Sequence, residues 1–185
     1  MNVRKSNICL RGFLIAILLI FMFSGCAKSP KTFDPGMKGP QVMVQPEAVS
    51  LGVVALAKTP IVFKGKGFEP GDSIFISLLN VKKGDKSVNL PIADGEVDKN
   101  GNFTAPVGTI SKVSDILNAK IGSNKKLETI IIVSQPTIPA GTYTAKATSL
   151  DSDKTATCKI RFKEPLLFDA IMDMLGSLSG KVVKK

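Results

Sequence analysis

The chain contains no histidine and no tryptophan, and it has one tyrosine and three cysteines among its 185 residues. Histidine is the usual general base and the usual partner of a nucleophilic serine or cysteine. Without histidine, most acid/base and nucleophile/base pairs lack a member. Carboxylate pairs such as Asp151 and Asp153 fall in a predicted turn, where a catalytic role is not expected. We therefore expect no enzymatic activity, no cofactor and no bound metal.

Apolar residues are plentiful, at 44% of the chain, and 25 lysines and arginines outnumber 15 acidic residues. This length and apolar content suffice for one domain with a real core. The lysines are dispersed and do not alternate with aromatic residues, so the sequence lacks the stacking platforms of a nucleic-acid groove. We expect a basic, soluble face near an anionic bilayer and no nucleic-acid partner.

The chain begins with a targeting segment. Arg4, Lys5 and Arg11 give it a positive start, and residues 12–23 form an apolar run. A run of about twelve residues suits the core of a signal peptide and is too short to cross a bilayer of about 30 Å as a helix. The segment is therefore predicted to direct export rather than to span a membrane.

Residues 23–26, Phe-Ser-Gly-Cys, follow at once and resemble the lipobox of bacterial lipoproteins, although that family usually has leucine where Phe23 stands. A thiol can accept a diacylglyceryl group as a thioether, and small side chains let an extended backbone enter a protease cleft. The resemblance implies that residues 1–25 are a cleaved signal peptide. It also implies that Cys26 is the lipid-attachment residue and holds the protein on a membrane. The alternative is an ordinary secretory signal with a chance cysteine.

The same resemblance implies a location. An aspartate directly after the lipidated cysteine commonly keeps such proteins at the inner membrane, whereas this chain has Ala27. In a host with two membranes this implies the outer membrane, on its periplasmic or surface face, and in a host with one membrane it implies the cell surface. Loss of residues 1–25 removes three basic and no acidic residues, which changes the formal net charge from +10 to about +7.

Residues 26–40 are predicted to be a lipidated N-terminus and a flexible tether. Residues 27–40, AKSPKTFDPGMKGP, contain three prolines and two glycines. A flexible segment of this length has an end-to-end distance of about 20 Å. We therefore expect the domain to clear the lipid headgroups.

From residue 41 to residue 163 short apolar segments alternate with turn signals such as EPGD, KKGD, KNGN and PAGT. This spacing is typical of antiparallel hairpins and Greek-key connections. One segment, ISKVSDILNAKIG, has apolar residues near helical spacing and predicts a short helix that crosses between the sheets. The predicted strands lie in VMVQPEAVSLG, TPIVFKGKGF, DSIFISLLNV, SVNLPIA, GEVDKNGNFTAPV, LETIIIVS, GTYTAKATSL and TATCKIRF.

Three of these stretches, IVFKGKGFEPGDSIFISL, DKNGNFTAPV and IPAGTYTAKATSLDSDKTATCKIRF, resemble the immunoglobulin-like domains, including the IPT/TIG type, of bacterial surface and exported proteins. The resemblance implies an all-β antiparallel sandwich over residues 41–163. Tyr143 is placed like a tyrosine corner, whose hydroxyl bonds to upstream backbone. Once Cys9 leaves with the signal peptide and Cys26 carries lipid, Cys158 stands alone, so no intrachain disulfide is expected. In TATCKIRF it belongs to the apolar side of an alternating pattern, so we expect it to face the core as a small apolar residue.

Two loops superficially match ligand-binding motifs. If Asp94 in DGEVDKNGN is the first calcium ligand, Lys99 stands where an EF-hand needs glycine and Ala105 where it needs glutamate. A hairpin turn around Asn100 and Gly101 is favoured instead. The segment KGKGFEPG is not followed by the GKS or GKT of a phosphate-binding loop and is predicted to be a turn.

The last segment is predicted to be an amphipathic helix over residues 164–180, followed by a basic tail over residues 181–185. Asp169 and Asp173 share one face of this helix with Ser177. Three fates of its apolar stripe remain open: packing on the sandwich, contact with a protein partner or another copy, and insertion into a bilayer surface. Acidic residues on the polar face fit an anionic membrane less well. The stripe comprises Leu167, Phe168, Ile171, Met174, Leu175 and Leu178.

Two functions follow from these features. In the first, the protein is a membrane-anchored, non-catalytic binding or structural module that offers sheet edges or end loops to a protein or a glycan at the cell envelope. In the second, it is an accessory or assembly factor of an envelope machine, such as a secretion, pilus or transporter system, and docks through its C-terminal helix. Deletion of residues 164–185 should spare the first function and abolish recruitment in the second.

Overall fold

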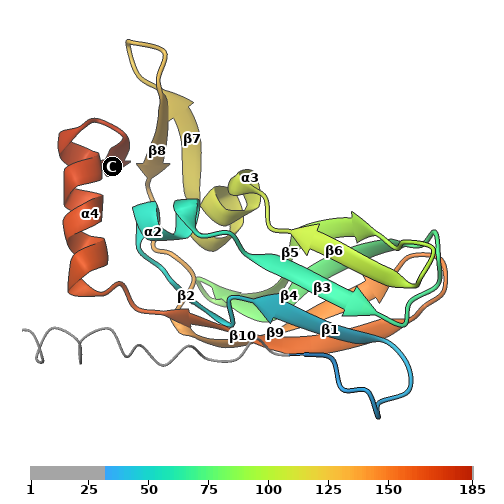
Figure 1. Cartoon of the computed structure of the whole chain (residues 1–185). Helices are drawn as coiled ribbons and strands as arrows, with labels where there is room; N and C mark the ends of the chain where they lie inside the picture. The colour runs from blue at the N-terminus through green and yellow to red at the C-terminus, as the bar shows by residue number, and fades with distance from the viewer. Residues whose placement is uncertain (1–31, 185) are drawn as a thin grey trace, which may run out of the picture. The chain divides into compact units, whose positions relative to one another are not determined.

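The computed structural model describes residues 32–184, and Phe33–Lys185 form one compact unit (Figure 1). The predicted signal peptide and Cys26 lie outside the described residues. No helix among residues 32–184 is long and apolar enough to cross a membrane. The elements are β1 (Gln41–Gln45), β2 (Ala48–Ser50), α2 (Val53–Lys58), β3 (Val62–Lys66), β4 (Ser73–Lys83), β5 (Lys86–Glu96), β6 (Asn102–Pro106), α3 (Thr109–Ser111), the π-helical segment η1 (Lys112–Ile116), β7 (Ala119–Ser123), β8 (Thr129–Val133), β9 (Gly141–Ser149), β10 (Thr155–Lys163), α4 (Leu167–Leu178) and β11 (Val182–Lys184).

The strands form three sheets, and two of them make a sandwich. One sandwich sheet has the order β1-β3-β6 and the other β2-β10-β9-β4-β5. The third sheet, in the order β11-β8-β7, lies at the end where α4 is found (Figure 1). The prediction of a β-sandwich is therefore confirmed at this level: the described chain is mostly β-strand, with two sheets in a sandwich-like arrangement.

The core of the sandwich follows from alternation along its strands. In β4, Ile74, Ile76 and Leu78 are fully buried while the residues between them are not. Successive strand residues point to opposite faces, so this period of two buries one face of each sheet. Phe63 of β3 and Phe162 of β10 belong to the same core. Cys158 of β10 is half-buried and packs against it, as predicted.

The first predicted strand is divided between the two sandwich sheets. β1 pairs antiparallel with β3, whereas β2 pairs parallel with β10. Pro46 lies between them, and proline has no N–H to continue a strand ladder. The chain therefore changes sheets after Gln45.

The segment ISKVSDILNAKIG differs from the prediction of a crossing helix. It is helical only through α3 and η1, where Val113 and Ile116 are buried. Asn118 then takes a left-handed conformation (φ 50°), which ends a helix, and β7 begins at the next residue. Ile121 consequently lies on a strand. The helical segment connects β6 to β7 and does not cross between the sandwich sheets.

Part of the predicted flexible tether over residues 26–40 is described by the structure, and that part contacts the domain. The Gln41 side chain accepts a hydrogen bond from the Asp34 N–H (2.9 Å) and donates to the carbonyls of Asp34 (2.9 Å) and Met37 (3.1 Å). The Lys66 Nζ lies 5.4 Å from the centroid of the Phe33 ring. The residues from Phe33 onward therefore belong to the domain, and residues 26–31 of the predicted tether lie outside the described residues.

The predicted hydrogen bond of Tyr143 is present. Its hydroxyl donates to the carbonyl of Pro139, four residues upstream, at 2.7 Å. The ring also meets Phe162 edge to face, with centroids 5.8 Å apart. Burial raises the pKa of Tyr143 above its ordinary value of 10.0.

Because Tyr143 is the only tyrosine and the chain has no tryptophan, phenolate absorbance reports this residue directly. Its raised pKa means that folding favours the neutral phenol. The associated stabilisation is complete below the unfolded pKa and is lost as the pH rises through the folded pKa. We expect the absorbance of the folded protein to titrate at higher pH than that of the urea-unfolded protein. Coincident titration curves would contradict this.

Candidate functional site

The C-terminal helix α4 lies beside the short helix α2 and supplies the cap that α2 lacks. Gly52, the residue at the start of α2, makes no side-chain capping bond. The Asp173 carboxylate accepts hydrogen bonds from the N–H of Val53 (Oδ2, 2.9 Å) and of Val54 (Oδ1, 2.8 Å). These are donors that a helix leaves unpaired at its first turn, and a negative charge there suits the helix dipole. Asp173 is only 9% exposed.

A second carboxylate of α4 also faces the domain. Asp169 Oδ2 accepts a hydrogen bond from the hydroxyl of Ser50 (2.6 Å) and another from the N–H of Leu166 (2.9 Å). The first bond attaches α4 to the end of β2, and the second satisfies a donor at the start of α4 itself. Close approach depends on Gly52, because a Cβ at that position would lie 2.7 Å from the Cβ of Asp169.

The other end of α2 is held by a cation. The Lys112 ammonium, on a side chain that is 5% exposed, donates to the carbonyls of Thr59 (2.7 Å) and Ala57 (3.4 Å). Burial lowers the pKa of Lys112 below its ordinary value. A positive charge at the C-terminus of a helix is favourable, so α2 lies between charges that match its dipole at both ends.

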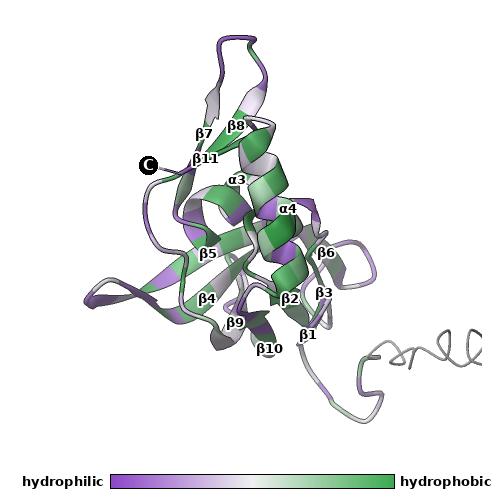
Figure 2. Cartoon of the chain, turned by 90° about the vertical axis from the view of Figure 1, so that its left-hand side faces the viewer, coloured by the Kyte–Doolittle hydropathy of each residue, from purple (hydrophilic) through white to green (hydrophobic). Residues whose placement is uncertain are grey.

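With both carboxylates turned inward, α4 presents its apolar stripe to solvent. Figure 2 shows α4 on the near side, coloured largely as hydrophobic. Asp169 and Asp173 are the only ionisable residues of α4, so its outward side carries no charge. We call this surface the α4 face; its members, with their exposed fractions, are Leu166 (67%), Leu167 (81%), Phe168 (69%), Ile171 (42%), Met174 (56%), Leu175 (49%) and Leu178 (78%).

Packing of this stripe on the sandwich, one of the three fates that the sequence left open, is therefore wrong. The helix instead packs through its narrow polar side, where Gly176 permits a close approach. A Cβ at Gly176 would lie 3.0 Å from a methyl group of Val182 and 3.2 Å from one of Val54. Val182 belongs to β11, which pairs parallel with β8, so the predicted basic tail over residues 181–185 is largely a strand.

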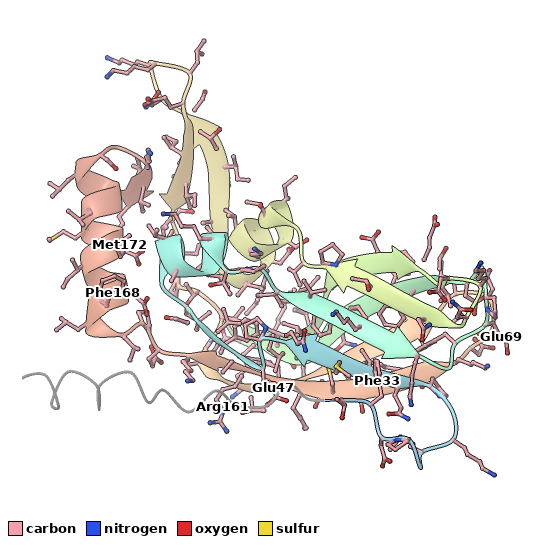
Figure 3. The ribbon with its side chains drawn as sticks, viewed as in Figure 1. Phe33, Glu47, Glu69, Arg161, Phe168 and Met172 are labelled. Carbon is pink, nitrogen blue, oxygen red and sulfur yellow. The ribbon has the colours of Figure 1, made fainter. Side chains whose placement is uncertain are left out.

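A groove of about 370 Å³ runs between α4 and α2, next to the α4 face. Phe168 and Met172 line it from α4 (Figure 3). Val54, Ala55 and Lys58 line it from α2. The apolar side chains of the groove adjoin the α4 face, and Lys58 and Asp169 add charged groups to its lining.

The other candidate sites have structural explanations. Asp98 Oδ1 accepts hydrogen bonds from the N–H of Asn100 (2.8 Å) and of Asn102 (2.9 Å), and these bonds lower the pKa of Asp98. Gly101 has a φ of 76°, so the predicted hairpin turn is confirmed. Asp151 lies in the β9–β10 turn. Within residues 32–184 no three His, Cys, Asp or Glu side chains converge as metal ligands would.

One buried carboxylate lies near the β9–β10 turn. Asp72, which is 6% exposed, accepts hydrogen bonds from the hydroxyls of Ser149 and Ser152, both at 2.5 Å. These two bonds lower the pKa of Asp72, against the opposing effect of burial. The two hydroxyl bonds attach the β9–β10 turn to the residue that precedes β4.

A second hollow, of about 600 Å³, lies between the β4–β5 turn and residues 135–139. Lys82 and Lys83 line it on one side, and Gln135 and Thr137 line it on the other. None of its lining residues is a carboxylate, a thiol or an imidazole. Its polar lining consists of lysine, amide and hydroxyl groups.

No protein-family model and no curated protein matches the chain. Among solved structures, macromomycin matches with 19% identity over 68% of this chain and 100% of its own, at a TM-score of 0.38. BslA, a bacterial hydrophobin, matches with 14% identity over 69% of this chain and 96% of its own, at a TM-score of 0.32. A β-glucosidase from Listeria innocua matches with 11% identity over 75% of this chain and 19% of its own, at a TM-score of 0.34. Similarity at this level assigns neither a family nor a function.

Replacement of Asp173 should destabilise the protein through α2. We expect Asp173→Ala to lower the free energy of unfolding by about 1–3 kcal/mol, because two backbone N–H groups lose their acceptor. We expect Asp173→Asn to cost less, because one oxygen remains to accept. Asp151→Ala, in an exposed turn, should change the free energy of unfolding by less than about 0.5 kcal/mol. Urea unfolding measures all three, and a wild-type midpoint for Asp173→Ala would rule out this role.

Proposed function

We propose that the chain is an exported lipoprotein of the cell envelope and acts there as a non-catalytic binding module. In this proposal the lipid on Cys26 holds it on a membrane, the sandwich serves as the scaffold, and the α4 face docks with a protein through helix-to-helix packing. The observation that carries the proposal is the uncharged, exposed α4 face on a helix whose carboxylates are turned inward.

The anchoring part of the proposal is supported by the sequence before the described residues. A positive start, a short apolar run and small residues precede Cys26. The compact unit begins at Phe33, so six residues, 27–32, lie between it and Cys26. Fully extended, they span at most about 25 Å. We place the protein at the outer membrane of a host with two membranes, from the Ala27 resemblance, and otherwise at the cell surface.

The immunoglobulin-like part of the proposal is supported by the path of the chain. The first predicted strand divides between the two sandwich sheets. Its first half, β1, pairs antiparallel with β3, and its second half, β2, pairs parallel with β10. The sheet order β2-β10-β9-β4-β5 and the Tyr143 hydroxyl bond fit the same topology. An immunoglobulin-like sandwich of the IPT/TIG type is a scaffold that carries many functions, so the function is argued from α4.

The docking part of the proposal is supported by composition. The cores of protein interfaces are depleted in charged residues and enriched in aromatic residues and methionine, as the α4 face is. Its anchors at positions i, i+4, i+7 and i+11 suit recognition by a helix or a groove. The end turns of the sandwich differ from the α4 face, because they carry charges. The Lys154 Nζ there lies 2.6 Å from the Oε1 of Glu69. The helix therefore has better support as the docking element than the sheet edges or end loops.

Lipid attachment is tested by intact-mass measurement of protein purified from its own host. We expect a chain that begins at Cys26 and carries the added mass of two or three acyl chains. Cys26→Ser should leave the chain unacylated and move it from the membrane fraction to the soluble fraction. An unacylated Cys26 in the wild-type protein would contradict the anchoring.

Docking is tested by a photo-crosslinking amino acid placed at Ile171 in the lipidated protein in its native envelope. We expect one adduct of defined mass at Ile171, and its loss when Leu167→Glu is added. The control position is Leu150, which is 60% exposed in the β9–β10 turn and should give no such adduct. An adduct at Ser87 of the edge strand β5, and none at Ile171, would instead support recognition through a sheet edge.

A further inference from the structure

The α4 face contains a seam of the kind that pairs with another helix. Leu167, Ile171, Met174 and Leu178 are spaced four, three and four residues apart, which is the heptad spacing of a two-helix contact. Each is exposed, by 81%, 42%, 56% and 78%. Three turns of α4 therefore present a continuous apolar ridge.

The attachment of α4 directs this seam straight away from the domain. Four residues of the helix are not exposed, namely Asp169, Met172, Asp173 and Gly176. In a heptad whose core positions are the four seam residues, these occupy the positions farthest from the core. The side that binds the domain and the side that carries the seam are therefore opposite sides of one helix.

The seam is complementary to itself when two copies run antiparallel. About a twofold axis midway between Ile171 and Met174, Ile171 meets Met174 of the second copy, and Leu167 meets Leu178. On one side of the seam the large flanking residues of the two copies then meet, Phe168 of one with Leu175 of the other. Small ones meet on the other side, where Ala170 faces Ser177 of the second copy. In a parallel pair the large flank of one helix would oppose the small flank of the other.

The available area suits a stable pair. Seven large side chains with these exposures present on the order of 600 Å² of apolar surface per copy. A stable interface buries about 800 Å² per partner, and the groove beside Phe168 and Met172 extends the surface toward that value. No charged residue of α4 would be buried without a partner, since Asp169 and Asp173 already bond to the domain.

We propose that the α4 face is covered by a second copy of this chain, with the two α4 helices packed antiparallel about a twofold axis between Ile171 and Met174. This inference rests on the proposed function, in which α4 is the docking element, and it identifies the partner. A bilayer surface fits less well, because helices that lie in a membrane interface carry basic residues beside their apolar side. In α4 one flank of the seam consists of Phe168 and Leu175 and the other of Ala170 and Ser177, so neither flank is basic.

The test uses the chain from residue 26 with Cys26→Ser, studied by sedimentation equilibrium without lipid or detergent. This chain should fold without the preceding segment, because Phe33–Lys185 form one compact unit that holds the described core. We expect a dimer at micromolar concentration. We expect Leu167→Glu or Met174→Glu to weaken dimerisation on the order of 100-fold, because each places two carboxylates per dimer in an apolar contact.

The matched control is Leu127→Glu at the tip of the β7–β8 hairpin, where the leucine is 86% exposed. It makes the same chemical change outside α4 and should leave the dimer intact. Equal urea midpoints for the three variants would show that the domain remains folded. A seam variant that unfolds is replaced by Ile171→Ser, which removes the apolar contact without adding charge.

Orientation is measured with a spin label at Ser179→Cys in a Cys158→Ala background. The antiparallel pair separates the two labels by about 20 Å along the helix axis, at 1.5 Å per residue. A parallel pair would bring them to about the 8–10 Å of neighbouring helices. A short distance would overturn the proposed geometry.

Other outcomes overturn the second copy as partner. A wild-type chain that stays monomeric at all concentrations, or a dimer that both seam variants leave intact, would do so. So would a monomer that binds anionic vesicles through Met174, since the bilayer would then be the occupant. If the chain is monomeric but Ile171 crosslinks to a different envelope protein, the second copy is wrong and the proposed function stands. If no adduct forms at Ile171, both fail.

Discussion

The arrangement of the C-terminal half depends on one contact, between the Asp173 carboxylate and the first backbone N–H groups of α2. A six-residue helix is too short to be stable alone, so α2 needs partners at its ends. Asp173 satisfies the start and Lys112 the end. Once Asp173 must point at α2, the rotation of α4 about its own axis is set, and every apolar side chain on its opposite side is turned to solvent. The exposed face is thus a geometric result of a buried hydrogen bond.

The sandwich and the α4 region play different physical roles. The sandwich is held by burial of alternating apolar residues such as Phe63, Ile76 and Phe162, which contribute whether or not anything is bound. The α4 region is held by a few directed polar contacts and a glycine, and it leaves its apolar area unused within the described chain. This division suits a scaffold that presents one surface, because changes on the outward side of α4 leave the core untouched.

Much of the sandwich could be predicted from the sequence, whereas the rotation of α4 could not. Alternation along segments such as SIFISLL marks the strands directly, and the position of Tyr143 predicts a bond that the structure contains. A helical pattern shows which residues of α4 share a side, but not which side meets the protein. Aspartates normally face water, and the N–H groups that bind Asp173 lie about 120 positions away in sequence. The sequence does not predict α2, because VVALAK has no capping residue before it, nor β11, because three residues are too few to show a strand pattern.

The end of the chain is secured as well as the helix that precedes it. β10 leads into α4, and β11 then pairs with β8, so α4 is held at both ends by strands of separate sheets. A segment fixed in this way has little freedom left to lose when it meets another surface. The entropy that a loose terminal helix would forfeit on association is already lost during folding, so association through α4 would carry a smaller ordering cost.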